Sequence, residues 1–177
     1  NRLNGEKNQV FVMPADGGEA RSLTAIEEGA QWPSWSPDGE TILFSSQVAM
    51  GENADGSDVD IVRRITYKVH SGSFLRGRRT HLFSVPSRGG KIRQLTDGEF
   101  DVESAVFSPD GSRVAFISNL EAYADLSEFK HLYSIPSKGG DPEFLWRNEK
   151  VSRLYSLGWS PDGKYVVVGV RHSVKIW

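Results

Sequence analysis

The chain has 177 residues, of which 38% are hydrophobic and 25% charged, and its formal net charge is −2. A net charge so close to zero creates no global electrostatic field that would attract nucleic acid or an anionic membrane surface. We therefore expect neither as a partner. The absence of Cys excludes a disulfide framework, a thiolate metal site and a Cys nucleophile. No apolar run approaches the roughly 20 residues that a membrane span requires.

Two short motifs, a Gly-Gly pair and the string Trp/Phe-Ser-Pro-Asp-Gly, alternate along the chain and mark repeats of about 40 residues. The pairs stand at 17–18, 89–90 and 139–140, and the strings stand at 35–39, 107–111 and 159–163. In Ser-Pro-Asp-Gly, Pro presets φ for the first corner of a turn, and Asp can bond nearby backbone N–H groups. Gly accepts the positive φ that closes a hairpin loop.

The segments between these markers are short, β-branched and aromatic, as in HLFSV (81–85) and RVAFIS (113–118), and this pattern predicts strands. Each unit holds four such segments joined by hairpin turns, so we expect a four-stranded antiparallel meander. In chain order the predicted strands lie at 9–14, 20–24, 31–36, 40–46, 80–86, 91–95, 103–108, 112–118, 130–136, 142–146, 155–160, 164–169 and 174–177.

One four-stranded sheet cannot bury both of its faces, whereas sheets stacked radially can, and repeats of this length are typical of an all-β fold, the β-propeller. We expect residues 1–177 to form a partial propeller. In each blade, the strand before Ser-Pro-Asp-Gly should be the innermost strand. Two complete blades, at 31–95 and 103–146, are flanked by half-blades at 1–24 and 155–177. A β-sandwich with coincidental turns is the alternative.

The chain begins and ends within patterned sequence, so we expect it to be a portion of a longer protein with unpartnered blade faces at both ends. The strands TILFSS (41–46) and YVVVGV (165–170) should expose apolar side chains there, and exposed blade edges could support self-association. Trp35, Phe107 and Trp159 recur in register at the end of the innermost strand. This recurrence favours packing between blades, and stacking on a ligand is the alternative.

One connection, residues 47–79, is much longer than its counterpart in the next unit, and functions of repeat proteins tend to lie in such departures. Its first half is acidic and its second half basic, and IVRRITYKV (61–69) alternates as an added strand would. Because arginine binds carboxylates, we predict that its arginines contact a substrate or a neighbouring domain. The alternative is a solvated hairpin extension whose charges contribute little. The candidate residues are Arg63, Arg64, Arg76, Arg78 and Arg79.

We expect no cofactor, no metal and no catalytic residue in this chain. The acidic string DGSDVD (55–60) lacks the spacing of an EF-hand loop, and the four His residues lack metal-ligand spacing. The chain contains no G-x-S-x-G nucleophile elbow, no phosphate-binding loop and no dinucleotide-binding fingerprint.

Two patterns resemble the propeller of the prolyl oligopeptidase family, above all its acylaminoacyl-peptidase-like branch. One is W/F-S-P-D-G combined with P-x-x-G-G-x-x-x-x-L-T, and the other is the run YKVHSGSFLRGRRTHLF (67–83). The resemblance covers essentially the whole chain but only the propeller part of the family, and none of the family's catalytic motifs has a match here.

The family joins an N-terminal propeller to a C-terminal α/β-hydrolase domain with a Ser-Asp-His triad. The resemblance therefore implies a non-catalytic portion of a cytoplasmic serine peptidase. Its partners would be that hydrolase domain and short peptides, whose access to the active site it would restrict or assist. The alternative is a free-standing propeller of Tol or WD-repeat type that binds proteins. A G-x-S-x-G string further along the parent reading frame would favour the first hypothesis.

Overall fold

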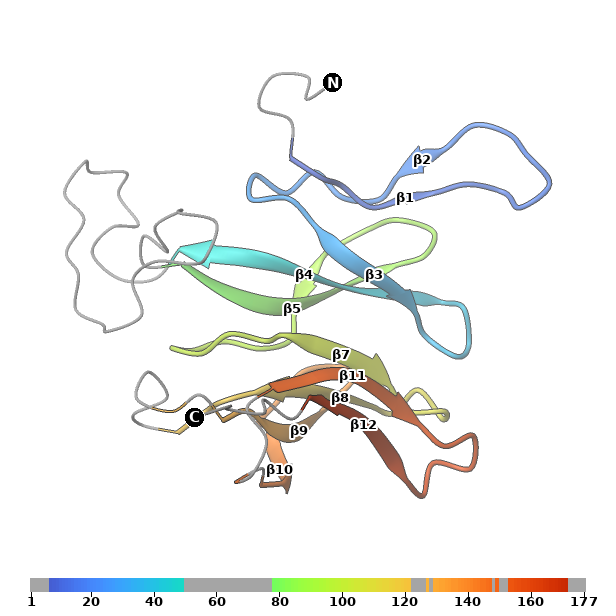
Figure 1. Cartoon of the computed structure of the whole chain (residues 1–177). Helices are drawn as coiled ribbons and strands as arrows, with labels where there is room; N and C mark the ends of the chain where they lie inside the picture. The colour runs from blue at the N-terminus through green and yellow to red at the C-terminus, as the bar shows by residue number, and fades with distance from the viewer. Residues whose placement is uncertain are drawn as a thin grey trace, which may run out of the picture.

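The computed structural model of the chain describes residues 7–49, 78–121, 127, 129–147, 149 and 153–171. Within these ranges the regular structure consists of twelve strands, which form four antiparallel sheets and no helix. The first three sheets lie one below another in Figure 1, and the sheet of β11 and β12, which overlaps the third in this view, packs on β8 through Ala115 and Ile117. The all-β prediction is confirmed, and successive packing of four sheets is the arrangement of a propeller rather than of a two-layer sandwich.

Each sheet is an up-and-down meander of consecutive strands. The first half-blade contains β1 (Phe11–Val12) and β2 (Arg21–Ser22). The first complete blade contains β3 (Gln31–Trp35), β4 (Thr41–Ala49), β5 (Arg78–Pro86) and β6 (Arg93–Gln94). The second complete blade contains β7 (Ser104–Phe107), β8 (Arg113–Ser118), β9 (His131–Pro136) and β10 (Glu143–Trp146). The second half-blade contains β11 (Arg153–Trp159) and β12 (Val166–Arg171).

The hairpin of β4 and β5 is longer than the sequence pattern predicted. Its ladder pairs the two strands continuously from Thr41 opposite Pro86 to Ala49 opposite Arg78. Residues 47–49 and 78–79, which we assigned to the long connection, therefore belong to the strands. The added strand predicted at 61–69 and the final strand predicted at 174–177 lie outside the described residues.

The Ser-Pro-Asp-Gly strings form tight turns that the Ser hydroxyl holds together. In the second turn the Gly111 N–H donates to the Ser108 carbonyl at 2.8 Å, with Gly111 at φ 70°. The Ser108 hydroxyl donates to the Asp110 carboxylate at 2.6 Å and accepts the Arg113 N–H at 3.0 Å. This serine bond, with the Ser112 N–H and hydroxyl, lowers the pKa of Asp110 from 3.8 to about 2. The turns at Ser36 and Ser160 repeat these hydrogen bonds.

The core lies between the sheets, and the second strand of each complete blade contributes to two interfaces. Along β8, Val114 and Phe116 pack toward the first complete blade, whereas Ala115 and Ile117 pack toward the second half-blade. Along β4, Leu43 faces the second complete blade. Because successive side chains of a strand point to opposite faces, an apolar run in the middle of a blade fills both interfaces.

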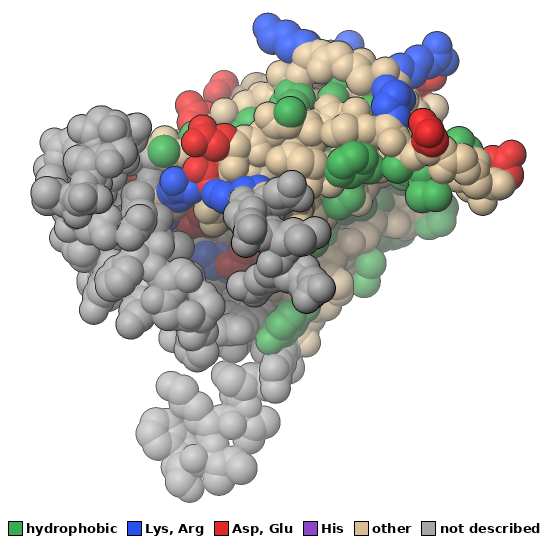
Figure 2. Space-filling view, turned by 90° about the horizontal axis from the view of Figure 1, so that it is seen from above, with side chains coloured by type: hydrophobic (Ala, Val, Ile, Leu, Met, Phe, Trp, Pro, Cys, Tyr) green, Lys and Arg blue, Asp and Glu red, His purple; other side chains and the backbone are tan. Residues whose placement is uncertain are grey.

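The expectation that TILFSS is exposed is therefore wrong. Ile42 and Phe44 are covered by side chains that include Val10 and Leu23 of the first half-blade, and Leu43 by the second complete blade. The corresponding expectation for YVVVGV holds, because Val167 and Val170 of β12 are 68% and 45% exposed. Figure 2 looks onto the opposite end of the stack, where apolar side chains lie among Lys, Arg, Asp and Glu.

The aromatic residue that precedes each Ser-Pro-Asp-Gly string packs between blades in two of the three units. Phe107 is 7% exposed within the cluster shared by the complete blades, and Trp159 packs on the cluster between β8 and the second half-blade. Trp35 is 54% exposed, contrary to our expectation. The reason is that the preceding sheet consists of only β1 and β2 among the described residues, so it offers Trp35 little surface.

We predict that Ser108→Ala destabilises the fold by about 1–2 kcal/mol, because it leaves the partly buried Arg113 N–H without its acceptor. The same change should raise the pKa of Asp110 toward its ordinary value. Urea unfolding and a carboxylate titration by NMR measure the two effects. Ser112→Ala, in the same turn but exposed, is the control for stability, and equal losses of unfolding free energy in the two variants would contradict this role for Ser108.

Candidate functional site

The innermost strands of three sheets border a cleft of about 440 Å³. Strand β3 comes from the first complete blade, β7 from the second, and β11, which lies beside β7, from the second half-blade. The residues that line the cleft are Trp32, Leu43, Phe44, Ser45, Leu82, Val102, Glu103, Ser104, Ala105 and Tyr155. We call this feature the inner cleft.

The inner cleft has a buried apolar floor and an exposed aromatic rim. Leu43, Phe44, Leu82 and Val102 are nearly inaccessible to solvent and belong to the packed clusters between blades. On the rim, Trp32 is 66% exposed and Tyr155 is 51% exposed. Large aromatic surfaces beside an apolar floor, with a few polar groups, are typical of sites that bind organic ligands.

Trp32 has a backbone conformation that L-residues rarely adopt. Its φ is 50°, and it is the one non-glycine residue of the described chain with a positive φ. The register of β3 against β4 moves from Gln31 opposite Ser45 to Ser34 opposite Leu43, so β3 carries one extra residue there. A β-bulge of this kind re-aims a side chain. Left-handed backbone at a bulky residue costs about 1–2 kcal/mol, so the surrounding packing must hold Trp32 in place.

Glu103 brings a carboxylate to the inner cleft. The segment that carries it is fixed by three bonds: the Val102 N–H donates to the Thr80 carbonyl at 2.9 Å, the Glu103 N–H to the Ile117 carbonyl at 3.0 Å, and the Ser118 hydroxyl to the Asp101 carbonyl at 2.8 Å. The Glu103 side chain is 45% exposed and lies 3.4 Å from the ammonium of Lys130. The carboxylate can therefore accept hydrogen bonds from a ligand in the cleft.

Arg79 is a buried structural residue. Its side chain is 6% exposed, and its guanidinium lies 3.0 Å from the Asp101 carboxylate and 3.7 Å from that of Glu99. The other Asp101 oxygen accepts the Thr80 N–H at 2.8 Å. Arg79 thus anchors the connection that leads to Val102 and Glu103.

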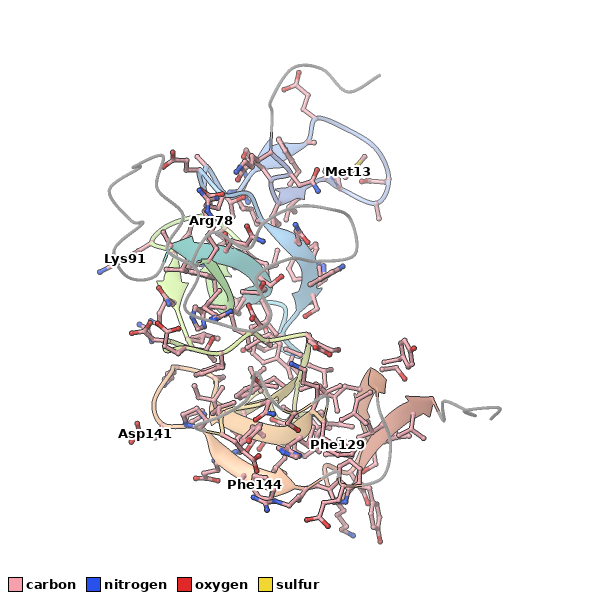
Figure 3. All side chains as sticks on the ribbon, turned by 60° about the vertical axis from the view of Figure 1, so that its left-hand side comes forward. Met13, Arg78, Lys91, Phe129, Asp141 and Phe144 are labelled. Carbon is pink, nitrogen blue, oxygen red and sulfur yellow. The ribbon has the colours of Figure 1, made fainter. Side chains whose placement is uncertain are left out.

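Arg78, which is labelled in Figure 3, pairs with the carboxylate of Glu28, a residue between β2 and β3. Glu28 also accepts a hydrogen bond from Lys7 at 2.6 Å. Lys7, and then Arg78, hold the pKa of Glu28 below its usual range. Arg63, Arg64 and Arg76 lie outside the described residues, so their contact with a substrate or domain stays a prediction.

Sequence reasoning missed the rim of the inner cleft. The available signal was the pair Trp32-Pro33, since Pro within a strand marks a bulge or an edge, and the other two units have no Pro in this strand. Glu103 and Tyr155 gave no such signal, because only the stacking of blades brings them together. Across the described ranges, no three His, Asp or Glu side chains gather as metal ligands, and no helix is long and apolar enough to cross a membrane.

Comparison with known proteins identifies a matching family. The family described as the dipeptidyl peptidase IV N-terminal region matches residues 59–173. A peptidase of Bacillus subtilis named YuxL, described as uncharacterized, is 34% identical over 137 residues, which cover 73% of this chain and 21% of that protein. The chain thus spans about a fifth of the length of this relative.

Solved structures share the fold. Pyrococcus horikoshii acylaminoacyl peptidase in its orthorhombic crystal form matches with a TM-score of 0.67 and 16% identity, covering 98% of this chain and 26% of that one. TolB from Acinetobacter baumannii matches with a TM-score of 0.58 and 18% identity, covering 94% and 33%. At these identities the likeness shows a propeller architecture.

We predict that Arg79→Met destabilises the protein by about 2–4 kcal/mol, because it removes the partner of a half-buried carboxylate. Arg78→Met, which breaks a more exposed pair, should cost less than about 1 kcal/mol. Denaturant unfolding of both variants measures the difference. If Arg79→Met lowers the free energy of unfolding no more than Arg78→Met does, the structural role assigned to Arg79 is wrong.

Proposed function

Because the chain belongs to the dipeptidyl peptidase IV N-terminal region family, the propeller region of prolyl oligopeptidase-like peptidases, we propose that it screens substrates for a peptidase. In this proposal the propeller covers the active site of a C-terminal α/β-hydrolase domain in the same parent protein. It restricts access to short peptides and helps to bind them, as in the acylaminoacyl-peptidase-like branch. A cytoplasmic location stays a prediction.

The inner cleft is the observation that supports this role most directly. Its rim offers the faces of Trp32 and Tyr155 to apolar or aromatic side chains, and Glu103 can accept a peptide N–H. Strained backbone such as that of Trp32 is often found at binding sites, where the surrounding packing holds the residue in its unfavourable conformation. A short peptide is a ligand that presents both apolar side chains and N–H donors.

The basic half of the long connection belongs to the same proposal. The connection leaves the first complete blade from the end of the β4–β5 hairpin, at Ala49 and Arg78. We propose that Arg63, Arg64 and Arg76 face the hydrolase domain or the entrance for substrate. Arg78 and Arg79 are engaged by Glu28 and Asp101 and would hold the base of the connection.

A free-standing propeller that binds proteins is the second candidate, because TolB has the same fold. The match to a peptidase family over residues 59–173 favours the first. A serine-directed fluorophosphonate separates the two hypotheses. We expect it to label the full-length protein and to block hydrolysis of acylated aminoacyl substrates. A full-length protein that neither reacts nor hydrolyses such substrates would favour the binding module.

Trp32→Gly tests the inner cleft without loss of the fold. Gly adopts a positive φ without strain, so we expect thermal stability to be retained or slightly raised. In the full-length protein, kcat/KM for short peptides should fall about tenfold, the equivalent of about 1.4 kcal/mol of lost transition-state binding. Hydrolysis of a small aryl ester, too small to reach the propeller, should not change.

Trp35→Ala is the matched control for this prediction, because Trp35 ends the same strand, is similarly exposed and does not line the inner cleft. Peptide kinetics of Trp32→Gly indistinguishable from those of Trp35→Ala would remove the inner cleft from substrate binding.

A further inference from the structure

Glu103 gives the inner cleft a single negative charge. Among the described residues that line the cleft, no other side chain is charged, and the rest are apolar or aromatic apart from two serines. The Glu103 N–H donates to the Ile117 carbonyl at 3.0 Å directly before β7 begins, so the backbone that carries this charge is fixed. The inner cleft therefore presents one carboxylate at a defined place in an otherwise neutral surface.

Lys130 balances this charge only loosely. Its ammonium lies 3.4 Å from Oε1 of Glu103, whereas a strong charge-assisted hydrogen bond between nitrogen and oxygen is about 2.7–2.9 Å long. The Lys130 side chain is 25% exposed and does not line the inner cleft. A carboxylate accepts hydrogen bonds at about four lone-pair positions, so Glu103 can bind a second cation in addition to Lys130.

The carboxylate decides which kind of group fits the inner cleft best. A neutral, apolar ligand would remove water from a Glu103 side chain that is 45% exposed without supplying a hydrogen bond, which is unfavourable. An anionic ligand would be repelled. A cationic group replaces the lost water with a charge-assisted hydrogen bond. Glu103 thus favours a cation over a neutral or anionic group of the same size.

The aromatic rim favours the same kind of group. Trp32 and Tyr155, which are 66% and 51% exposed, come from the blades before and after the one that contains β7. The faces of indole and phenol rings attract cations, and a guanidinium also stacks on them. The inner cleft holds about 440 Å³, toward the small end of the range for ligand pockets. One inserted side chain would therefore lie close to both rings and to Glu103.

The floor of the inner cleft suits the rest of such a side chain. Leu43, Leu82 and Val102 form a buried apolar surface there. Lysine and arginine lay their methylene stems on apolar surfaces and keep the charged head near water. A stem that lies along this floor would place its head at the rim, where the carboxylate and the two aromatic rings are.

We propose that the inner cleft is a subsite for a lysine or arginine side chain of a peptide, and that Glu103 selects for its positive charge. This inference rests on the peptide-binding role proposed above. Trp32 and Tyr155 hold the charged head by cation–π contacts. Lys130 moderates the selection, because its ammonium offsets part of the negative charge that Glu103 presents to the ligand.

Peptide pairs of nearly equal shape test the proposal in the full-length protein. Arginine is compared with citrulline, which has a neutral urea in place of the guanidinium, at each position of peptides acetylated at the amino-terminus. We expect kcat/KM of the arginine peptide to exceed that of the citrulline peptide about tenfold at one position. If the citrulline peptide with a free amino-terminus is hydrolysed faster than the acetylated arginine peptide, the subsite binds the terminal ammonium and the proposal is overturned.

The two partners of the ion pair provide matched variants. Glu103→Gln removes the negative charge and should lower the ratio of arginine to citrulline hydrolysis to about one. Lys130→Met breaks the same ion pair but leaves Glu103 charged, so the ratio should rise. A merely structural role of the pair would not move the ratio in opposite directions in the two variants, and this result would overturn the role of Glu103. Melting temperatures show whether both variants fold.

Binding of small blocked amides separates this proposal from the peptidase role. In calorimetric titrations of the full-length protein, acetyl-arginine amide should bind more tightly than acetyl-citrulline amide. Peptide hydrolysis at equal rates for arginine and citrulline at every position would overturn the subsite and leave the peptidase role intact. Preferential binding of the arginine amide by a protein that hydrolyses no peptide would support the subsite and contradict the peptidase role.

Discussion

Packing of one sheet on the next is the interaction on which this structure depends. Each complete blade has apolar side chains on both faces, and a four-stranded sheet has no means of covering either face itself. The alternation along β8 shows the consequence: Phe116 fills one interface and Ile117 the other, and both are fully buried. The stability of a blade is therefore inseparable from that of its neighbours.

The same packing creates the inner cleft. Trp32 and Tyr155 belong to two different sheets and Glu103 directly precedes β7 of a third, and the three residues are separated by more than fifty residues at each step along the chain. Stacking of the blades brings their innermost strands together, and the clusters beneath them supply a rigid floor. Such a floor can hold the unfavourable backbone of Trp32, which a lone hairpin would release. The site and the core thus share one set of contacts.

Much of the architecture was readable from the sequence, because hairpin turns depend on local chemistry. Asp110 and Gly111 occupy their predicted places in the turn, and the Ser108 hydroxyl adds bonds that the pattern alone did not indicate. Exposure was harder to predict, because it depends on what lies beside a sheet. Ile42 is buried since two short strands suffice to cover it, whereas the equally apolar Trp35 is not covered.

The candidate site was less accessible to sequence reasoning than the fold. Length and charge drew attention to the long connection, yet its described arginines, Arg78 and Arg79, are occupied by carboxylates of the fold. The residues of the inner cleft meet through long-range packing, which leaves no spacing in the sequence.

The dependence on packing between blades is tested most directly by truncating the same motif residue in two units. Phe107 and Trp35 both end an innermost strand, but only Phe107 lies between two complete blades. In the 177-residue chain, Phe107→Ala should lower the free energy of unfolding by about 3–5 kcal/mol. Trp35→Ala should lower it by about 1 kcal/mol or less, because its side chain is already half exposed. Equal losses at the two positions in denaturant unfolding would contradict this account.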